Sequence, residues 1–542
     1  MRAPEPEEDE LRGVAAFRPA WWQKLLAEPS SFELTRFVLL RALAFVQLFA
    51  FLSLARQFAP LLGSDGLLPA GQWLDEVKAH LGADAYWRVP TVFWLGHSDG
   101  LLQALAWIGV ALCLASLLGA TNAVLQLATW ALYMSFVHVG QTFYGYGWEI
   151  QLLETTFLAV FLCPVRTLGP FPRTRTPVLV VWLFRWLIFR VMVGAALIKL
   201  RNDPCWRDLT CLDFHFETQP NPSPLSWWFH GAPHALHATG VLFNHFVELV
   251  VPFFAFGPRR MRHVAGALLV FFQLTLIASG NLSFLNWLTV VPALACFDDT
   301  AFARLLPPVR RTRVTNAFPA EPLSRWQIGA TRTLGVVVGL LSVGPAANLL
   351  SSDQAMNTSF DPLDLVNTYG AFGSVDRERY EVILEGTSDP TPTPWTRWQE
   401  YQLPCMPGDP RRRPCLVGPY HYRLDWQMWF VGNGAPRGQT IEGEPWLVHL
   451  VWKLLRGDPT PKSLLAVDPF PREPPAWVRA SVWRYHFARN RDGGAWWVRE
   501  RVGPFLRPVA RDDDDLRTYV AASRWNDADD FDVGPVPAPG AR

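Results

Sequence analysis

Long apolar stretches occupy most of the first 350 residues of this 542-residue chain and limit the folds that it can adopt. A helix needs roughly 20 mostly apolar residues to cross about 30 Å of bilayer hydrocarbon. Residues 101–120 contain no charged side chain, and His138 is the one histidine in the otherwise uncharged stretch 122–143. Seven further apolar stretches lie at 36–62, 148–164, 178–200, 235–257, 264–284, 285–297 and 328–350. The pattern predicts an α-helical multipass membrane bundle of about nine spans over residues 36–350, in which 285–297 is the shortest span.

Arginine residues are concentrated in some of the connections between these stretches. The connection 164–177 contains three arginines and no acidic residue, and so does the connection 257–263, whereas residues 63–100 contain five acidic and two basic residues. Lys and Arg are enriched in the cytoplasmic loops of membrane proteins. The distribution therefore predicts that the amino-terminal segment 1–35 is cytoplasmic and that, after nine crossings, the carboxyl-terminal domain lies outside.

The sequence changes character after residue 360. Short alternating runs at 380–385, 398–403 and 477–487 are typical of strands, and proline and glycine residues separate them. Residues 445–456 are typical of a helix, with proline at the start and Gly457 after the end. We therefore expect a β-rich, sandwich-like soluble domain over residues 360–510. The polar composition of 511–542 and of the acidic start 1–10 predicts disorder.

The seven cysteines fall into two groups. Cys113, Cys163 and Cys296 lie in apolar stretches, where free thiols behave as small apolar groups. The other four form two pairs that are close in sequence and lie on the side predicted to be outside: Cys205 with Cys211, and Cys405 with Cys415. An oxidising compartment favours disulfides at both pairs, and four free thiols are the alternative. Neither pair has the Cys-x-x-Cys spacing of thiol oxidoreductases, which favours structural bridges.

Several ionisable residues lie inside the predicted spans, where a charge is costly and usually faces a bundle interior or an aqueous cavity. They are Glu149, Glu154, Arg185, Lys199, His245 and Glu248. The simplest interpretation is that they form ion pairs between helices, because unpaired charges do not insert readily. Catalysis and transport are the alternatives, and Lys199 could also extend to the outer interface. His245 and Glu248 lie one helical turn apart, but one helix supplies too few ligands for a metal site.

Other function classes find no support in the sequence. The net charge of +1 gives no basic surplus of the kind that nucleic-acid binding requires. The sequence contains no nucleotide-binding loop, nucleophile elbow or zinc-binding spacing. We therefore predict no nucleic-acid partner, no cofactor and no metal site.

Several unusual segments resemble the lipase maturation factor family. The resemblance runs from about residue 85 to residue 460, and its most specific segments are 144–154, 204–211, 216–220, 244–254, 279–292, 295–299, 365–370, 381–386 and 423–430. It implies a multipass membrane protein that helps secreted lipases, or related exported hydrolases, to reach their active form. It also implies that the carboxyl-terminal domain contacts this client, which makes Tyr369, Arg423, Asp425, Trp426 and Trp429 client-binding candidates.

The membrane half is also distantly similar to vitamin K-dependent gamma-glutamyl carboxylase, through residues 193–200. This similarity makes Lys199 a candidate base in a second hypothesis, in which the protein is a membrane enzyme. Its cavity would be lined by Glu149, Glu154, Arg185 and Lys199 and would modify a lipid or a protein. We favour the non-enzymatic maturation factor; a transporter is a weaker alternative because we find no paired repeats.

The membrane in which the protein resides depends on its source. The chain contains 44 arginines and five lysines, a bias that indicates GC-rich coding and favours a bacterial inner membrane. A eukaryotic member of the family would reside in the endoplasmic reticulum membrane. Membrane lipids and an exported lipase or hydrolase are the expected partners, and the oligomeric state stays open.

Overall fold

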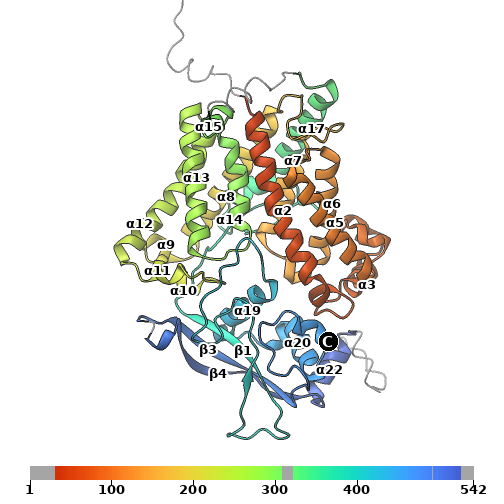
Figure 1. Cartoon of the computed structure of the whole chain (residues 1–542), viewed down its shortest axis with the longest axis vertical. Coiled ribbons are helices and arrows are strands. Elements are labelled where there is room, and N and C mark those ends of the chain that lie inside the picture. The colour runs from red at the N-terminus through yellow and green to blue at the C-terminus, as the bar shows by residue number, and fades with distance from the viewer. Residues whose placement is uncertain (1–30, 308–320, 491, 526–542) are drawn as a thin grey trace, which may run out of the picture.

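The computed structural model describes residues 31–307, 321–490 and 492–525, and places a bundle of helices against a smaller unit that contains the sheet (Figure 1). The predicted disorder at 1–10 lies outside the described residues, and so does nearly all of the predicted cytoplasmic segment 1–35. Residues 526–542 of the predicted disordered tail also lie outside them.

Six helices of the described chain are long and apolar enough to cross a membrane. They are α2 (Glu33–Leu62), α5 (Asp99–Leu118), α8 (Val178–Arg201), the span His234–Phe256, α13 (Arg259–Ser279) and the span Arg325–Leu350. The span His234–Phe256 consists of α12 (His234–His245), the π-helix η5 (Phe246–Val250) and the 3₁₀-helix η6 (Val251–Phe256). The span Arg325–Leu350 consists of α17 (Arg325–Leu341) and α18 (Val343–Leu350). The prediction of a multipass helical membrane domain is confirmed.

Three of the predicted spans correspond to shorter helices, so the predicted number of nine spans is not confirmed. These helices are α6 (Ala123–Val139), α7 (Gly147–Val160) and α14 (Leu285–Ala293) with its 3₁₀ extension η7 (Leu294–Cys296). Each of them is nevertheless packed inside the bundle, where α6 contacts α7, and α14 contacts both α7 and α8.

The connections of the helical half contain short helices. They include α3 (Ala70–Leu81), η2 (Gly82–Asp84), α4 (Ala85–Arg88), η3 (Val92–Leu95), η4 (Gln141–Tyr144), α9 (Pro204–Arg207), α10 (Leu212–Thr218) and α11 (Ser226–His230). Helices α9, α10 and α11 lie on the side facing the sheet (Figure 1). At the opposite end lies α15 (Asp299–Arg304) (Figure 1).

The bundle is held together by close apolar packing and by a few polar contacts between helices, as in other membrane bundles. Helix α2 packs along α5, where Gly109 leaves room for the ring of Phe51: a Cβ atom at this glycine would lie 2.1 Å from that ring. In the interior, the Gln47 amide donates hydrogen bonds to Gln126 (3.2 Å) and Thr156 (2.9 Å). These bonds satisfy the amide nitrogen of Gln47, which has no access to water.

The smaller unit contains one antiparallel sheet of four strands in the order β2-β1-β3-β4. The strands are β1 (Arg379–Thr387), β2 (Gln399–Glu400), β3 (Trp477–Phe487) and β4 (Trp497–Ala510). In the register, Val382 of β1 lies opposite Val482 of β3. Helix α19 (Arg423–Gly434) packs on β1, and α20 (Pro445–Arg456) contacts β3 and α22 (Asp514–Ala522). The remaining short helices are η8 (Ala435–Arg437), η9 (Ile441–Gly443), α21 (Pro459–Lys462) and η10 (Asp492–Gly494).

The sequence-based predictions for this half have mixed outcomes. The strands at 380–385 and 477–487 and the helix at 445–456 are confirmed, whereas the strand at 398–403 is reduced to two residues. The sandwich is not confirmed, because the described residues form a single sheet with helices packed against it. The predicted disorder from residue 511 onward is wrong for 514–522, which form α22. This helix is stabilised at its start by Asp513, whose side chain accepts a hydrogen bond from the amide of Leu516 (3.1 Å).

Candidate functional site

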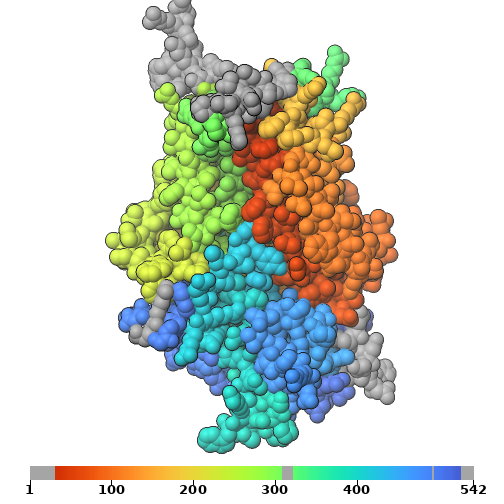
Figure 2. Space-filling view, viewed as in Figure 1, coloured from red at the N-terminus to blue at the C-terminus, as the bar shows by residue number. Residues whose placement is uncertain are grey.

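The helical and soluble halves are joined by a contact that we call the junction. The helical half contributes α2, α7, α8 and the connections 202–219 and 280–284, and the soluble half contributes segment 365–379, segment 403–422 and α19. Figure 2 shows the soluble half directly against the helices, with no separating gap on this face. Gln57 of α2 donates a hydrogen bond to the carbonyl of His421 (2.6 Å), and its side-chain oxygen accepts one from the amide of Arg423 (3.0 Å). Residues far apart in sequence therefore form one continuous interior.

Glu149, near the start of α7, holds one part of the junction. Its carboxylate forms an ion pair with Arg423 of α19, with 2.8 Å between the charged atoms, and both side chains are fully buried. The Tyr133 hydroxyl donates a hydrogen bond to the same carboxylate. The Arg423 guanidinium also donates to the carbonyl of Phe143 (2.6 Å) and lies 3.4 Å from the centroid of the Tyr144 ring. A helix of the bundle thus supplies the counter-ion for a charge that belongs to the soluble half.

Glu154, five residues further along α7, holds a second part. It forms an ion pair with Arg190 of α8, and it accepts hydrogen bonds from the Tyr369 hydroxyl (2.7 Å) and from the amide of Asn367 (3.1 Å). Arg190 in turn donates to the carbonyl of Asn367 (2.6 Å). Segment 367–369 is therefore fixed to two helices of the bundle, and α8 comes so close to it that a Cβ atom at Gly194 would lie 2.3 Å from the Tyr369 carbonyl oxygen.

Both predicted disulfides are present in the structure, and both belong to loops at the junction. Beside the Cys205–Cys211 bridge, Trp206 donates a hydrogen bond to the carbonyl of Phe372 (2.8 Å), and Asp203 forms an ion pair with Arg377 (2.8 Å). Burial acts to raise the pKa of Asp203, but hydrogen bonds from Arg377 and from backbone amides outweigh it and lower this pKa to about 2.

The same loop brings three potential metal ligands together, but they do not make a metal site. The ligand atoms of Asp203, Cys205 and Cys211 lie within 4.8 Å of one another. Both sulfurs are used in the disulfide, which leaves one carboxylate as a donor. A thiolate must be free and deprotonated to bind a metal.

The second disulfide loop, closed by Cys405 and Cys415, is held from both sides. From the helical half, Asn281 donates to the carbonyl of Cys415 (2.9 Å) and accepts from the amide of Val417 (2.9 Å). From the soluble half, Asp425 accepts hydrogen bonds from the amides of Cys405 (2.5 Å) and Met406 (3.1 Å). Burial raises the pKa of Asp425 to about 7, although these amides oppose the shift.

The five client-binding candidates lie at this junction. Tyr369, Arg423, Asp425 and Trp426 are buried, and Trp429 is half-buried. The Trp426 ring packs against a tryptophan of α7, and Trp429 donates a hydrogen bond to a backbone carbonyl of α10 (2.9 Å). Four of them therefore bind the two halves of the chain to each other, whereas Asp425 binds the disulfide loop of its own half. Client contact through these side chains stays a prediction.

Lys199 does not extend to the outer membrane interface, so that alternative prediction is wrong. It is 4% exposed, its Nζ lies 2.6 Å from a Glu248 carboxylate oxygen, and it donates a hydrogen bond to Asn244 (3.0 Å). Glu248 lies in the π-helix η5, a distortion that is frequent at functional sites. His245 points elsewhere, since its Nε2 lies 2.9 Å from the carbonyl oxygen of Trp206.

The prediction that ionisable groups pair between helices is therefore confirmed for Glu154 and Lys199, whose partners lie within the bundle. Glu149 is also paired, but its partner Arg423 belongs to a helix of the soluble half. The predicted shared cavity lined by Glu149, Glu154, Arg185 and Lys199 is wrong. The two glutamates are enclosed in the junction, and Arg185 donates to the carbonyl of Ala295 (2.9 Å) near the other end of α14. Periodicity identifies buried charges but does not determine which helices bring them together.

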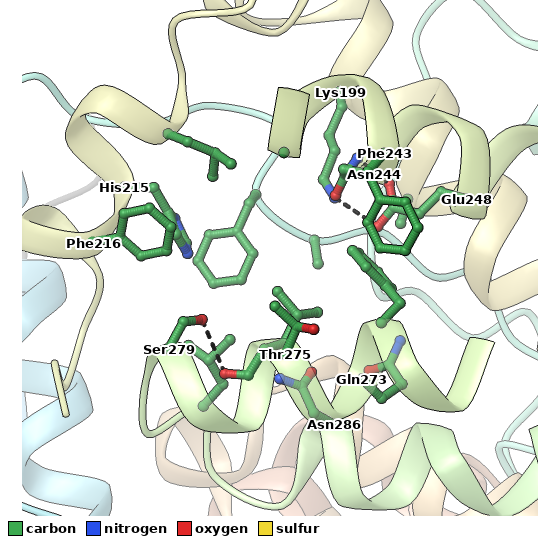
Figure 3. A pocket seen from close by; sticks show the side chains of 18 of the residues that line it. Lys199, His215, Phe216, Phe243, Asn244, Glu248, Gln273, Thr275, Ser279 and Asn286 are labelled. Atoms are coloured by element: carbon green, nitrogen blue, oxygen red, sulfur yellow. Dashed lines mark hydrogen bonds and ion pairs between the residues drawn. The ribbon is translucent and has the colours of Figure 1, made fainter. Parts of the chain in front are cut away.

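Lys199 lines a cavity of about 300 Å³ between α8, α10, α12, α13 and α14 (Figure 3). Most of the lining is apolar, and the polar side chains that reach it include His215, Asn244, Gln273 and Asn286. Burial, together with the positive charge of Lys199, lowers the pKa of His215 to about 4, so this imidazole is uncharged near neutral pH. Gln273 and Asn286 are not among the predicted site residues, although polar amides inside apolar stretches were the signal that could have found them.

Comparisons with known proteins cover both halves of the chain. Residues 34–304 match the lipase maturation factor transmembrane domain, and residues 365–507 match the lipase maturation factor C-terminal domain. Lipase maturation factor 1 of Bos taurus is 50% identical over 522 residues, which cover 91% of this chain and 92% of that protein. The Mus musculus protein of the same name is 45% identical over 567 residues, covering 98% and 96%. Lipase maturation factor 2 of Homo sapiens is 29% identical over 609 residues, covering 90% and 84%.

No solved structure matches this chain. The two matched regions cover most of its sequence, and relatives with 45–50% identity match it over nearly their whole length. The chain belongs to the lipase maturation factor family.

Proposed function

We propose that this protein is a membrane-anchored maturation factor for secreted lipases or related exported hydrolases, and that its soluble half holds the client. The observation that carries the proposal is the junction, in which two buried carboxylates of one membrane helix bind Arg423 and the segment around Tyr369. A buried, charge-paired contact of this kind fixes the soluble half relative to the membrane. The names of the relatives, lipase maturation factors 1 and 2, supply the class of client.

The proposal includes nine membrane crossings, a cytoplasmic amino terminus and a soluble half on the outside. Support comes from contacts between connections at the end of the bundle opposite the sheet (Figure 1). There the amide of Ala123 bonds the carbonyl of Pro164 (2.8 Å), and the amide of Arg175 bonds the carbonyl of Glu321 (3.1 Å). The arginines of 164–177 and 257–263 belong to this same end of the bundle. Their enrichment there is typical of cytoplasmic loops. The membrane would be the inner membrane in a bacterium and the endoplasmic reticulum in a eukaryote.

We further propose that the client contacts the surface of the soluble half that is farthest from the bundle. Trp395 lies in the loop between β1 and β2 and is 92% exposed. An exposed aromatic side chain offers a contact to apolar surface of a client that has not finished folding. This loop lies at the end of the molecule opposite the helices (Figure 1).

Site-specific photo-crosslinking tests this function in cells that secrete a lipase. A benzophenone amino acid at position 395 is expected to capture the lipase, and expression of the chain is expected to raise the amount of active lipase in the medium. The matched control is the same amino acid at Leu118, which is 80% exposed at the other end of the bundle. Capture at residue 118 but not at residue 395 would overturn the proposed side of contact. An unchanged amount of active lipase would contradict the function itself.

The carboxylase-like enzyme is not favoured, because both matched regions belong to lipase maturation factors. A test of Lys199 separates the two hypotheses. Lys199→Met leaves Glu248 buried without its counter-ion, so we expect a lower melting temperature and less active lipase. The double variant Lys199→Met/Glu248→Met removes both charges and is expected to recover most of both. A double variant that is as stable as the parent but inactive would instead indicate that Lys199 acts as a base.

A further inference from the structure

The cavity beside Lys199 lies toward the membrane face of the bundle. Among the lining residues that belong to the candidate membrane spans, the partly exposed ones lie on two helices: Leu236, Gly240 and Phe243 of α12, and Thr275 and Leu276 of α13. The other partly exposed lining residues lie outside these spans: Leu212, Phe229, Ala232, Leu285, Ala371 and Phe372. Within the neighbouring span, α13 packs mainly against η6, the part farthest from α12, and α12 is tilted relative to α13 (Figure 1). The space between α12 and α13 is therefore the side on which the cavity reaches the membrane-facing surface of the bundle.

Two amide side chains face this cavity without adequate hydrogen-bond partners. Asn286 of α14 is 4% exposed, and its amide nitrogen has no hydrogen-bond partner among the described residues. Gln273 of α13 is 3% exposed, and its amide nitrogen has only the sulfur of Met192, at 3.8 Å. Burying an unsatisfied amide donor costs about 1–3 kcal/mol. Figure 3 shows both residues on one side of the cavity.

On the opposite side of the cavity from Asn286 and Gln273, the ammonium group of Lys199 has its polar partners. Lys199 donates to Asn244 and pairs with Glu248, whose second oxygen accepts from the Asn244 amide (3.0 Å). The Lys199 ammonium also lies 4.8 Å from the centroid of the Trp206 ring. One positive and one negative charge cancel in this cluster. A charged ligand would have to displace one member of the pair, whereas an uncharged acceptor could bind Asn286 without disturbing it.

We propose that this cavity binds a fatty-acyl chain of an uncharged membrane glycerolipid, which enters between α12 and α13. Its ester carbonyl would accept hydrogen bonds from Asn286 and Gln273. The volume of about 300 Å³ is at the lower end of the range of roughly 300–1,000 Å³ for ligand sites, which suits one acyl chain. No chemical step on the lipid is involved. The proposal is independent of the lipase client, and its test contains no lipase.

The test uses the full chain in nanodiscs that contain diacylglycerol with a diazirine in one acyl chain. Illumination is expected to label peptides of α12 and α13 that line the cavity. Thr275→Trp, which fills the opening, is expected to reduce this labelling about ten-fold, equivalent to about 1.4 kcal/mol of binding free energy. Leu274→Trp is the matched control, because Leu274 is 51% exposed and does not line the cavity. Equal labelling in both variants would overturn the proposal.

Asn286→Leu provides a second measurement that does not depend on blocking the opening. The change keeps a side chain of similar size and removes a buried donor that lacks a partner, so the melting temperature is expected to stay the same or rise. The labelling of the cavity is expected to fall several-fold. Undiminished labelling would show that the amide does not bind the lipid. A lower melting temperature in lipid-free detergent would show that Asn286 serves the fold instead.

Discussion

Replacement of Arg423 by methionine is expected to abolish most of the production of active lipase. The change leaves the Glu149 carboxylate fully buried without its counter-ion, with the Tyr133 hydroxyl as its remaining side-chain hydrogen-bond donor. Removing one partner of a buried ion pair typically costs about 3–5 kcal/mol. Because this pair joins the two halves of the chain, the loss should separate them. The readouts are the melting temperature of the purified protein in detergent and the active lipase secreted.

Two further variants give this experiment its controls. Arg413→Met changes an exposed arginine of the same half and is expected to leave both readouts within experimental error of the parent. The double variant Arg423→Met/Glu149→Gln removes both charges and retains an acceptor for Tyr133, so part of the stability should return. If the double variant is no more stable than Arg423→Met, the ion pair is not what holds the junction.

The junction also determines which experiments on this protein are informative. Deleting the soluble half would remove Arg423 from Glu149, and Tyr369 and the Asn367 amide from Glu154, so the membrane half would itself be destabilised. A loss of function in such a deletion would not identify the client-binding surface. Substitutions at exposed positions such as Trp395 avoid this ambiguity because they leave the junction unchanged.

Local features of the sequence were enough to predict several elements of the fold. The helix 445–456 carries proline in its first turn and ends at Gly457, which adopts a left-handed conformation (φ +74°). Strand β4 was missed because Gly503, Pro504 and Pro508 interrupt its pattern. Proline is tolerated there because β4 lies at the edge of the sheet, where one side needs no hydrogen-bond donor.

The partners of the buried charges could not be predicted in the same way. The high cost of an unpaired charge in a bilayer predicts that Glu149 has a counter-ion. It does not reveal that this counter-ion is Arg423, 274 residues away and in the other half of the chain. The cavity was missed for a similar reason, since it depends on how α12, α13 and α14 pack in three dimensions. Periodicity within one helix contains no information on such packing.

Variants at the second ion pair of the junction, between Glu154 and Arg190, test whether Tyr369 has a structural role or binds the client. Arg190→Met leaves Glu154 buried without its counter-ion and is expected to cost about 3–5 kcal/mol, with a comparable loss of active lipase. Tyr369→Phe removes one hydrogen bond to the same carboxylate and is expected to cost about 1.5–3 kcal/mol. The melting temperature and the lipase output should therefore fall together, and further in Arg190→Met. If Tyr369→Phe lowers lipase output at an unchanged melting temperature, the Tyr369 hydroxyl contacts the client, and the junction must open while the client is bound.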